Sequence, residues 1–237
     1  MNELKKYLEQ YPNAKILDIG TGKGDFIGLI DYLYQDYNEI IGIDVIDYLL
    51  EMDKESFKDN PKIRFTNEDI LSATFPKQSF DIISLSNTFH HFTNIEDTLK
   101  HMVSLLKPGG IIIISELISD NSTKQQVSHK LLHHFAAKID REIGVIHSQT
   151  CDKEGILKSV KKYSPIPVID YWDLMVKDYE INVKLSKLYD IIDNLLVNVK
   201  DSKQYNDYKK ESEEIKKYLK ANGFQLANKL CMILKDI

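Results

Sequence analysis

A glycine-rich turn near the start of the chain most constrains its fold. The turn, Asp18-Ile19-Gly20-Thr21-Gly22-Lys23-Gly24, follows a short apolar segment over 15–20 and precedes a segment of helical character over 25–37. Glycines let a backbone bend sharply and approach a ligand closely, because no Cβ stands in the way. The pattern predicts a strand–turn–helix unit whose turn either faces a ligand or is only a tight turn.

The spacing of the glycines argues against a dinucleotide site. The turn reads G-x-G-x-G, and Asp25 stands where the G-x-G-x-x-G motif has its third glycine. An acidic residue at the N-terminus of a helix also disfavours a pyrophosphate, since the two negative charges would compete for one helix dipole. A cationic or zwitterionic ligand suits this turn better.

The first half of the chain alternates strand-like and helix-like segments, which is typical of a parallel sheet covered by helices. A helix over 95–106 is expected to end at Lys107-Pro108-Gly109-Gly110, a strong stop and turn signal. We expect further strands over 39–44, 62–69, 80–86 and 110–117.

Helices dominate the second half of the sequence. Helical periodicity runs from Ser122 to about Arg141, and a loop over 144–150 precedes another helix that ends near Lys162. The lysine and glutamate run over 209–220 is most simply a solvated helix face. We expect two more helices over 178–200 and 203–221, and two short strands over 165–172 and 229–237.

Two carboxylates end the strands that follow the glycine turn. Asp44 ends the second expected strand, where a carboxylate can accept hydrogen bonds from both hydroxyls of a ribose. Asp69 ends the third, where it could accept a hydrogen bond from an adenine amino group. Ligands of open parallel sheets bind at these strand ends, so the set describes an adenosine-shaped site. The alternatives are a helix N-cap for Asp69, before Ile70, and a plain turn residue for Asp44.

Five segments, taken in order, resemble the small-molecule branch of the class I S-adenosylmethionine-dependent methyltransferases. They are ILDIGTGKG, IGIDV, NED, FDIISLSNTFHHF and LKPGGIIIISE, and they lie within about residues 15–117. The resemblance implies an α/β fold with a Rossmann-like, seven-stranded, mostly parallel sheet whose last strand is antiparallel. It places the cofactor-binding core at 1–118, completed by 163–172 and 223–237, and helical insertions that cover the substrate at 119–162 and 173–222.

The same resemblance implies S-adenosyl-L-methionine as cofactor, with S-adenosyl-L-homocysteine as product. The glycine turn would hold the methionine end, the second strand end the ribose and the third the adenine, while the fourth strand end would face the sulfonium and the substrate. The matching cofactor-binding positions are Asp18, Gly20, Thr21, Gly22, Asp44, Val45, Asp69, Ile70, Ser86 and Asn87.

Methyl transfer is an in-line displacement, so the protein mainly aligns nucleophile and methyl group and excludes water. A general base is needed only where the nucleophile arrives protonated. His90 and His91 directly follow the fourth strand and are candidates for a base or for orienting the substrate. The alternative is that one of them packs against the following helix.

A second group of titratable residues lies on the helix expected over 122–141. His129, His133 and Asp140 fall on one helical stripe, and His147 follows in the next loop. This set is chemically able to hold a divalent metal, to line a polar substrate pocket, or to be only solvated. We take His133 as a candidate catalytic residue on the acceptor side and expect no bound metal.

Composition limits the partners and the compartment. The net charge of −5 does not indicate a nucleic-acid surface, and the fourth strand lacks the Asn/Asp-Pro-Pro-aromatic string of enzymes that methylate base nitrogens. Two cysteines, no signal-peptide pattern and no long apolar run predict a cytoplasmic protein without a membrane span. A homodimer is compatible with the sequence.

Three functional hypotheses follow. The first is methyl transfer to a small-molecule acceptor, which the sequence does not identify. The second is a regulator that binds S-adenosylmethionine without turnover. The third, a nicotinamide-dependent oxidoreductase, would need the missing third glycine and a parallel sixth strand.

Overall fold

The computed structural model describes residues 1–47, 54–120, 122–174 and 184–236. Within these ranges the chain divides into two compact units. The first comprises residues 1–116, 157–174 and 230–237, and the second comprises residues 117–156 and 175–229. The expected helix residues 178–183 lie outside the described residues.

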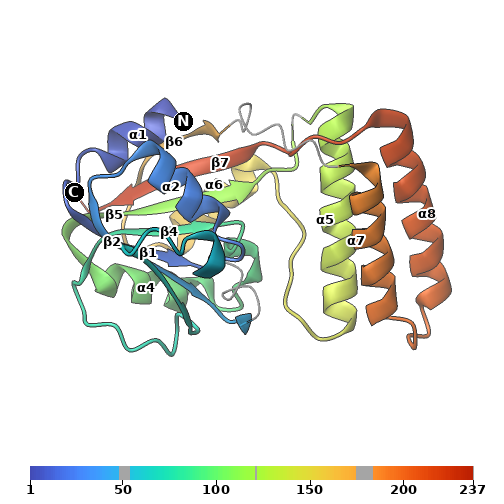
Figure 1. The fold of residues 1–237 in the computed structure, drawn as a ribbon, viewed down its shortest axis with the longest axis horizontal. Coiled ribbons are helices and arrows are strands. Elements are labelled where there is room, and N and C mark those ends of the chain that lie inside the picture. Colours follow the sequence, from blue (N-terminus) through green and yellow to red (C-terminus); the bar gives the residue numbers. More distant parts are fainter. Residues whose placement is uncertain (48–53, 121, 175–183, 237) are drawn as a thin grey trace. The chain divides into compact units, whose positions relative to one another are not determined.

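A seven-stranded sheet of order β3-β2-β1-β4-β5-β7-β6 forms the centre of the first unit (Figure 1). β1 pairs in parallel with β2 on one side and with β4 on the other, so the strand order reverses between β1 and β4. The strands are β1 (Ala14–Ile19), β2 (Tyr37–Asp44), β3 (Ile63–Asn67), β4 (Phe80–Ser86), β5 (Leu106–Leu117), β6 (Val168–Leu174) and β7 (Lys229–Lys235).

The last strand runs antiparallel to its neighbours, as expected from the resemblance. The amide of Ile118, just past the end of β5, donates to the carbonyl of Asn228, just before the start of β7. The amide of Lys235, at the end of β7, donates to the carbonyl of Pro167, just before the start of β6. Both contacts join the end of one strand to the start of the next, which is the antiparallel arrangement.

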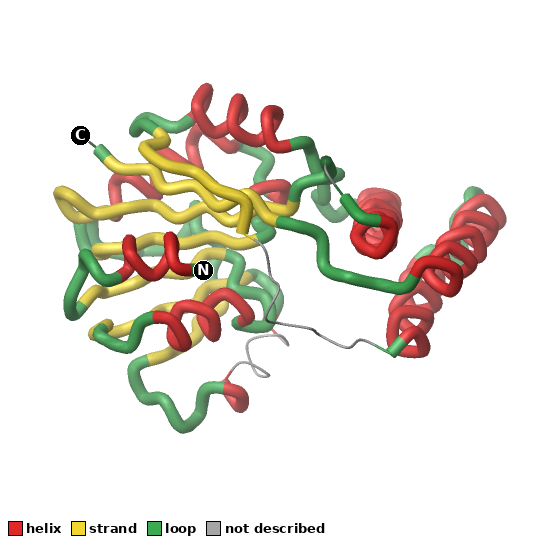
Figure 2. The backbone as a smooth tube through the Cα atoms, turned by 90° about the horizontal axis from the view of Figure 1, so that it is seen from above, coloured by secondary structure: helices red, strands yellow, loops and turns green. Residues whose placement is uncertain are grey.

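Helices lie on both sides of the sheet (Figure 2). One face is covered by α1 and α2, whose Leu4, Leu8, Ile27 and Ile30 belong to the same buried cluster as alternate residues of the strands. The helices of the first unit are α1 (Asn2–Leu8), α2 (Asp25–Leu33), the short 3₁₀ turn η1 (Phe89–His91), α4 (Ile95–Leu105) and most of α6 (Lys153–Tyr163), which begins in the second unit.

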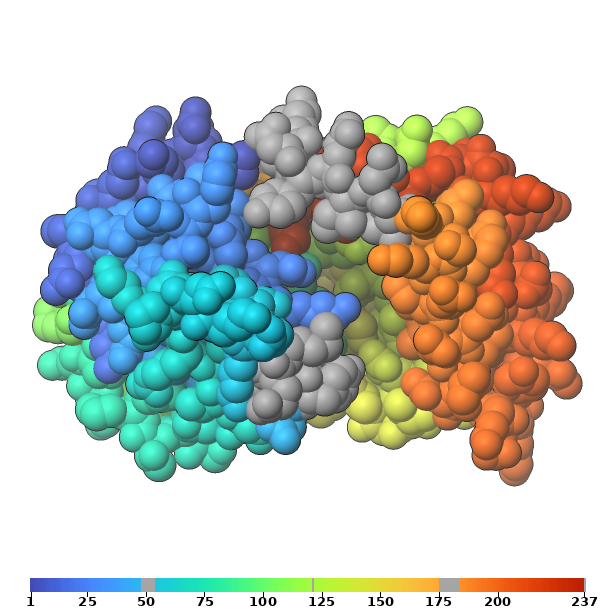
Figure 3. Space-filling model, viewed as in Figure 1, coloured from blue at the N-terminus to red at the C-terminus, as the bar shows by residue number. Residues whose placement is uncertain are grey.

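Three helices with a core of their own make up most of the second unit: α5 (Lys124–Glu142), α7 (Leu185–Asn198) and α8 (Tyr205–Asn222). Phe135, Ile192 and Leu219 are fully buried in this core. The outer face of α7, orange in Figure 3, leaves Ile191 and Val197 exposed. No helix among the described residues is both long and apolar enough to cross a membrane.

Two of the expected boundaries that differ from the structure do so for a local reason. The helix expected over 25–37 ends at Leu33, because the buried rings of Tyr34 and Tyr37 anchor an extended segment there; the Tyr34 hydroxyl donates to the carbonyl of Asp36 at 2.5 Å. The Pro108-Gly109-Gly110 string is not a turn before β5 but lies inside it. The register with β4 shifts there, so the string forms a bulge.

Candidate functional site

The candidate site lies in the first unit, at the carboxyl ends of the parallel strands around the point where the strand order reverses. β1 leads there into the glycine turn, β2 into Asp44, and β4 into Asn87. In open parallel sheets this edge is where loops leave a crevice for a ligand. The local chain geometry at each strand end shows what such a ligand would meet.

The glycines of the turn differ in what a side chain at each position would contact. Gly20, Gly22 and Gly24 all have a positive φ, of 64°, 58° and 70°. A Cβ on Gly20 would lie 2.3 Å from the Cγ2 atom of Thr88, whose hydroxyl donates to the Gly20 carbonyl at 3.1 Å. A Cβ on Gly22 would meet nothing within 4 Å among the described residues. Gly20 therefore packs against Thr88, just after the end of β4, while Gly22 has open space beside it within the described part of the chain.

Backbone hydrogen bonds tie the turn to the neighbouring strand. The amide of Thr21 donates to the carbonyl of Ile43 at 3.0 Å, and the amide of Gly24 donates to the carbonyl of Thr21 at 2.9 Å. The Thr21 hydroxyl is buried and has no hydrogen-bond partner within the described part of the chain. A buried polar group of this kind is normally satisfied in the working protein, so it marks a place for a ligand or an ordered water.

Asp44 stabilises the turn from the end of β2. One carboxylate oxygen accepts the amide of Gly22 at 2.8 Å, and the other accepts the amide of Ile46 at 2.9 Å. A carboxylate oxygen has two lone pairs, so each can accept one more hydrogen bond. The adjacent Val45 side chain is 64% exposed. Asp44 can thus hold the loop and still bind two hydroxyl groups.

The third strand end differs in detail from the prediction. β3 stops at Asn67, so Asp69 lies beyond the strand, where its carboxylate accepts the amide of Leu71 at 2.9 Å in a turn. Asp69 is exposed and Ile70 is buried. Sequence reasoning missed Asn67, whose side-chain amide donates to the carbonyl of Asp44 at 3.2 Å and joins the two strand ends.

The fourth strand end combines a buried pair with a strained residue. Asp18 is 1% exposed, and its carboxylate accepts the hydroxyl of Ser84 on β4 at 2.6 Å. Asn87, after the last strand residue Ser86, is exposed and has φ 54°, a left-handed conformation that asparagine tolerates. Its amide donates to the carbonyl of Ser115 on β5 at 2.9 Å.

His90 and His91 form the short η1 turn after this strand end, with ring centroids 4.3 Å apart. The Nδ1 atom of His90 lies 2.8 Å from a carboxylate oxygen of Glu116, at the end of β5. If Nδ1 carries the proton donated to Glu116, the Nε2 atom is left as an acceptor, as in a general base. Sequence reasoning missed Glu116 as a partner of His90, because the contact joins two strand ends that lie 26 residues apart in the chain.

The second unit separates the histidines of α5. The Nδ1 atom of His129 accepts the backbone amide of Ala227 at 3.0 Å, and burial lowers the pKa of His129 to about 4. His133, Asp140 and His147 instead lie together: His147 contacts the Asp140 carboxylate through Nδ1 at 2.6 Å and His133 through Nε2 at 3.3 Å. Of the residues expected to form one group, His133, Asp140 and His147 therefore lie together, and His129 does not.

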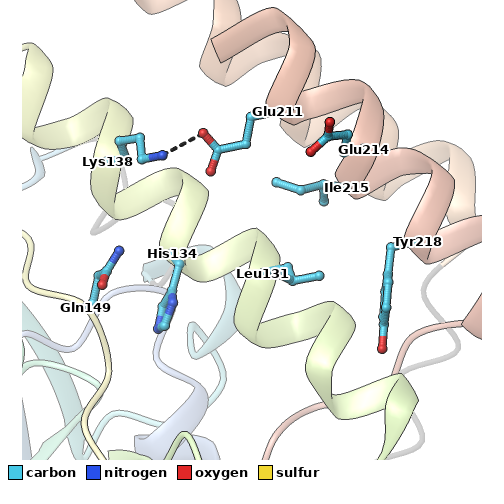
Figure 4. Close-up of a pocket in the computed structure, with 8 residues that line it drawn as sticks. All are labelled: Leu131, His134, Lys138, Gln149, Glu211, Glu214, Ile215 and Tyr218. Carbon is cyan, nitrogen blue, oxygen red and sulfur yellow. Dashed lines mark hydrogen bonds and ion pairs between the residues drawn. The ribbon is translucent and has the colours of Figure 1, made fainter. Parts of the chain in front are cut away.

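A pocket of about 370 Å³ lies between α5 and α8 within the second unit (Figure 4). Lys138 and Glu211 form an ion pair at 2.6 Å across it. The Nε2 atom of His134 lies 2.7 Å from the Thr150 hydroxyl. Burial, and then the positive charges of Lys130 and Arg141, lower the pKa of His134 below its usual range.

Comparison with known proteins finds a family match within the first unit. Residues 17–114 match the family model described as a methyltransferase domain. A stretch of 156 residues is 24% identical to the ubiquinone/menaquinone biosynthesis C-methyltransferase UbiE of Shewanella sediminis, covering 64% of this chain and 61% of that enzyme. The chain spans less than two thirds of the length of the first curated relatives that it matches.

Two solved structures share the fold. A methyltransferase from Thiobacillus denitrificans, solved with S-adenosyl-L-homocysteine, has a TM-score of 0.59 and 16% identity, covering 100% of this chain and 90% of its own. The [4+2]-cyclase SpnF has a TM-score of 0.61 and 14% identity, covering 99% of this chain and 78% of its own. At these identities the likeness concerns the fold alone.

The two glycines of the turn should respond differently to substitution. Gly20→Ala should destabilise the protein by at least about 1 kcal/mol more than Gly22→Ala, because only the Cβ at position 20 collides with Thr88. Both variants carry the cost of a positive φ, so that cost cancels in the comparison. Urea unfolding followed by circular dichroism measures the difference; equal midpoints would contradict the packing of Thr88 on Gly20.

His129 should make stability depend on pH. Its folded pKa of about 4 lies below the usual pKa of an imidazole, 6.5, so between these values the unfolded chain binds a proton that the folded chain does not. The contribution of His129 to the free energy of unfolding is therefore fully present above about pH 6.5. It decreases as the pH falls toward 4, by up to about 1.4 kcal/mol per pH unit. His129→Gln keeps an acceptor for Ala227 and should flatten the curve; parallel curves for both proteins would refute the burial of a neutral imidazole.

Proposed function

We propose that this chain, a member of the class I S-adenosylmethionine-dependent methyltransferases, transfers a methyl group from S-adenosyl-L-methionine to a small-molecule acceptor. The proposal depends mainly on Asp44, which can hold the glycine turn and bind a ligand at the same time. Its carboxylate holds Gly22 and Ile46 and keeps two acceptor positions beside the open space at Gly22. This arrangement suits the two hydroxyls of a ribose.

The residues at the strand ends fit the rest of the cofactor. Gly20, Thr21 and Gly22 would lie against the methionine end, where the open position at Gly22 and the buried Thr21 hydroxyl offer room and a hydrogen bond. Exposed aliphatic side chains at Val45 and Leu71 offer apolar surface to an adenine ring. The other proposed contacts are Asp18, Asp69, Ile70, Ser86 and Asn87.

The cofactor supplies a methyl group already activated by a sulfonium leaving group. The protein has to align the acceptor with that methyl group and exclude water. We assign His90 to the removal of a proton from the acceptor through Nε2, with Glu116 holding the ring by its Nδ1 contact. Catalytic roles for His91 and His133 remain predictions.

The helical insertions are the part of the chain that we assign to the acceptor. We infer that the insertions over 119–162 and 173–222 select the acceptor, since they form a separate helical core of their own. The net charge of −5 favours a small molecule over nucleic acid. Cys151 and Cys231 form no disulfide, which fits the cytoplasm of the cell.

Calorimetric titration with S-adenosyl-L-methionine, S-adenosyl-L-homocysteine and NAD tests the cofactor. We expect micromolar binding of both adenosyl compounds and none of NAD. Asp44→Ala should weaken that binding at least about tenfold, since it removes a hydrogen-bonded carboxylate. Asp47→Ala, which removes an exposed carboxylate three residues on, is the matched control and should leave affinity within about threefold.

Two outcomes would count against the proposal. NAD binding without adenosyl binding would require the glycine turn to be a dinucleotide site. Adenosyl binding without methyl transfer to any acceptor in a panel of small molecules, followed with a methyl-labelled cofactor, would favour a regulator over an enzyme.

A further inference from the structure

The end of α5 and the loop that follows it place three polar side chains together in the second unit. His133 and Asp140 are seven residues apart, so they lie two helical turns apart on one face of α5. His147 comes from the loop after the helix and contacts both of them. One imidazole thus bridges a carboxylate and a second imidazole.

The loop is held in this position by its own hydrogen bonds. The chain turns back at Gly144, whose φ is 85°, and the amide of Val145 donates to the carbonyl of Asp140 at 2.8 Å. The guanidinium of Arg141 donates to the carbonyl of His147 at 2.6 Å. The backbone at His147 is therefore held by contacts that do not involve its imidazole ring.

The Asp140 contact sets the chemistry of the His147 ring. The Asp140 carboxylate lies 2.6 Å from Nδ1, which favours a proton on that nitrogen. In the neutral ring, Nε2 is then the atom with the lone pair. A carboxylate that orients a histidine in this way is the usual outer partner of a metal-binding imidazole.

The spacing of the two imidazoles matches that of two ligands on one metal ion. Their Nε2 atoms are 3.3 Å apart. Two nitrogens at about 2.0–2.1 Å from a tetrahedral Zn²⁺ are separated by about 3.3–3.4 Å. The ring centroids are only 4.8 Å apart and the rings are nearly perpendicular, at 86°. If both rings pointed straight at each other in an N–H···N hydrogen bond, their centroids would lie farther apart than this. At least one ring therefore directs its Nε2 lone pair away from the line between the two Nε2 atoms.

We propose that His133 and His147 bind a divalent transition-metal ion through their Nε2 atoms, with Asp140 orienting His147. Neutral imidazoles select Zn²⁺, Co²⁺, Ni²⁺ or Cu²⁺ over Mg²⁺ and Ca²⁺, which prefer oxygen ligands. Two protein ligands leave coordination positions for water or for an exchangeable ligand. All three side chains belong to the second unit.

Titration of the tag-free full chain with Zn²⁺ at pH 7.5, in a buffer that does not chelate metals, tests the proposal. We expect one equivalent to bind with a micromolar dissociation constant. His133→Gln and His147→Gln should each weaken that binding at least tenfold. His134→Gln is the matched control, because His134 lies on the same helix but contacts Thr150, and its variant should bind within threefold of the parent.

Asp140→Asn distinguishes a positioning role from a purely structural one. It should weaken Zn²⁺ binding by about tenfold to a hundredfold, since it removes the carboxylate that orients the ligand ring. Circular dichroism and the thermal midpoint without metal should stay close to the parent's for all four variants. With Co²⁺ as probe, visible absorption bands of a four-coordinate ion should appear in the parent and be lost in His147→Gln.

Two results would overturn the proposal. One is the absence of Zn²⁺ binding by the parent at up to a hundred-micromolar concentrations. The other is binding that persists unchanged in both His133→Gln and His147→Gln, which would place the metal elsewhere on the chain.

Discussion

The hydrogen bonds of the Asp44 carboxylate join the end of β2 to the glycine turn after β1, and the rest of the candidate site depends on that link. Three glycines with positive φ make the turn costly to order and easy to displace. One carboxylate oxygen bonded to Gly22 and the other to Ile46 hold both loops at fixed positions. Asn67 in turn bonds the Asp44 carbonyl, so the ends of three strands are fixed together.

Each of the two units has its own hydrophobic core. The sheet buries one continuous cluster that includes Ile16, Ile40 and Ile113. The second unit buries another, formed by α5, α7 and α8, with Phe135 and Ile192 among its residues. Among the described residues the two clusters share no side chain, so each unit has a hydrophobic core of its own.

Local signals in the sequence predicted much of this structure. The strand over 80–86 was correct at both ends, and the helix expected from Ser122 begins after Thr123, whose side chain forms a capping box with Gln126. The antiparallel last strand came from the resemblance alone. These features depend on short-range patterns or on a family of known fold.

Features that depend on contacts between distant residues could not be predicted. The Glu116 partner of His90 and the Asn67 bond to Asp44 join strand ends that only the folded sheet brings together. His129 shares a helical stripe with His133, yet its Nδ1 atom accepts a hydrogen bond from the backbone amide of Ala227, a residue 98 positions away. The Gly109-Gly110 pair predicted a turn, and the structure has a strand irregularity there instead, because glycine is common in both.

A crystal structure with S-adenosyl-L-homocysteine would show whether the strand ends around Asp44 form an adenosyl-cofactor site. We expect both ribose hydroxyls within hydrogen-bond distance of the Asp44 carboxylate and the amino-acid end against Gly20 to Gly22. A ligand bound elsewhere, or one bound at this edge without contact to Asp44, would contradict this expectation.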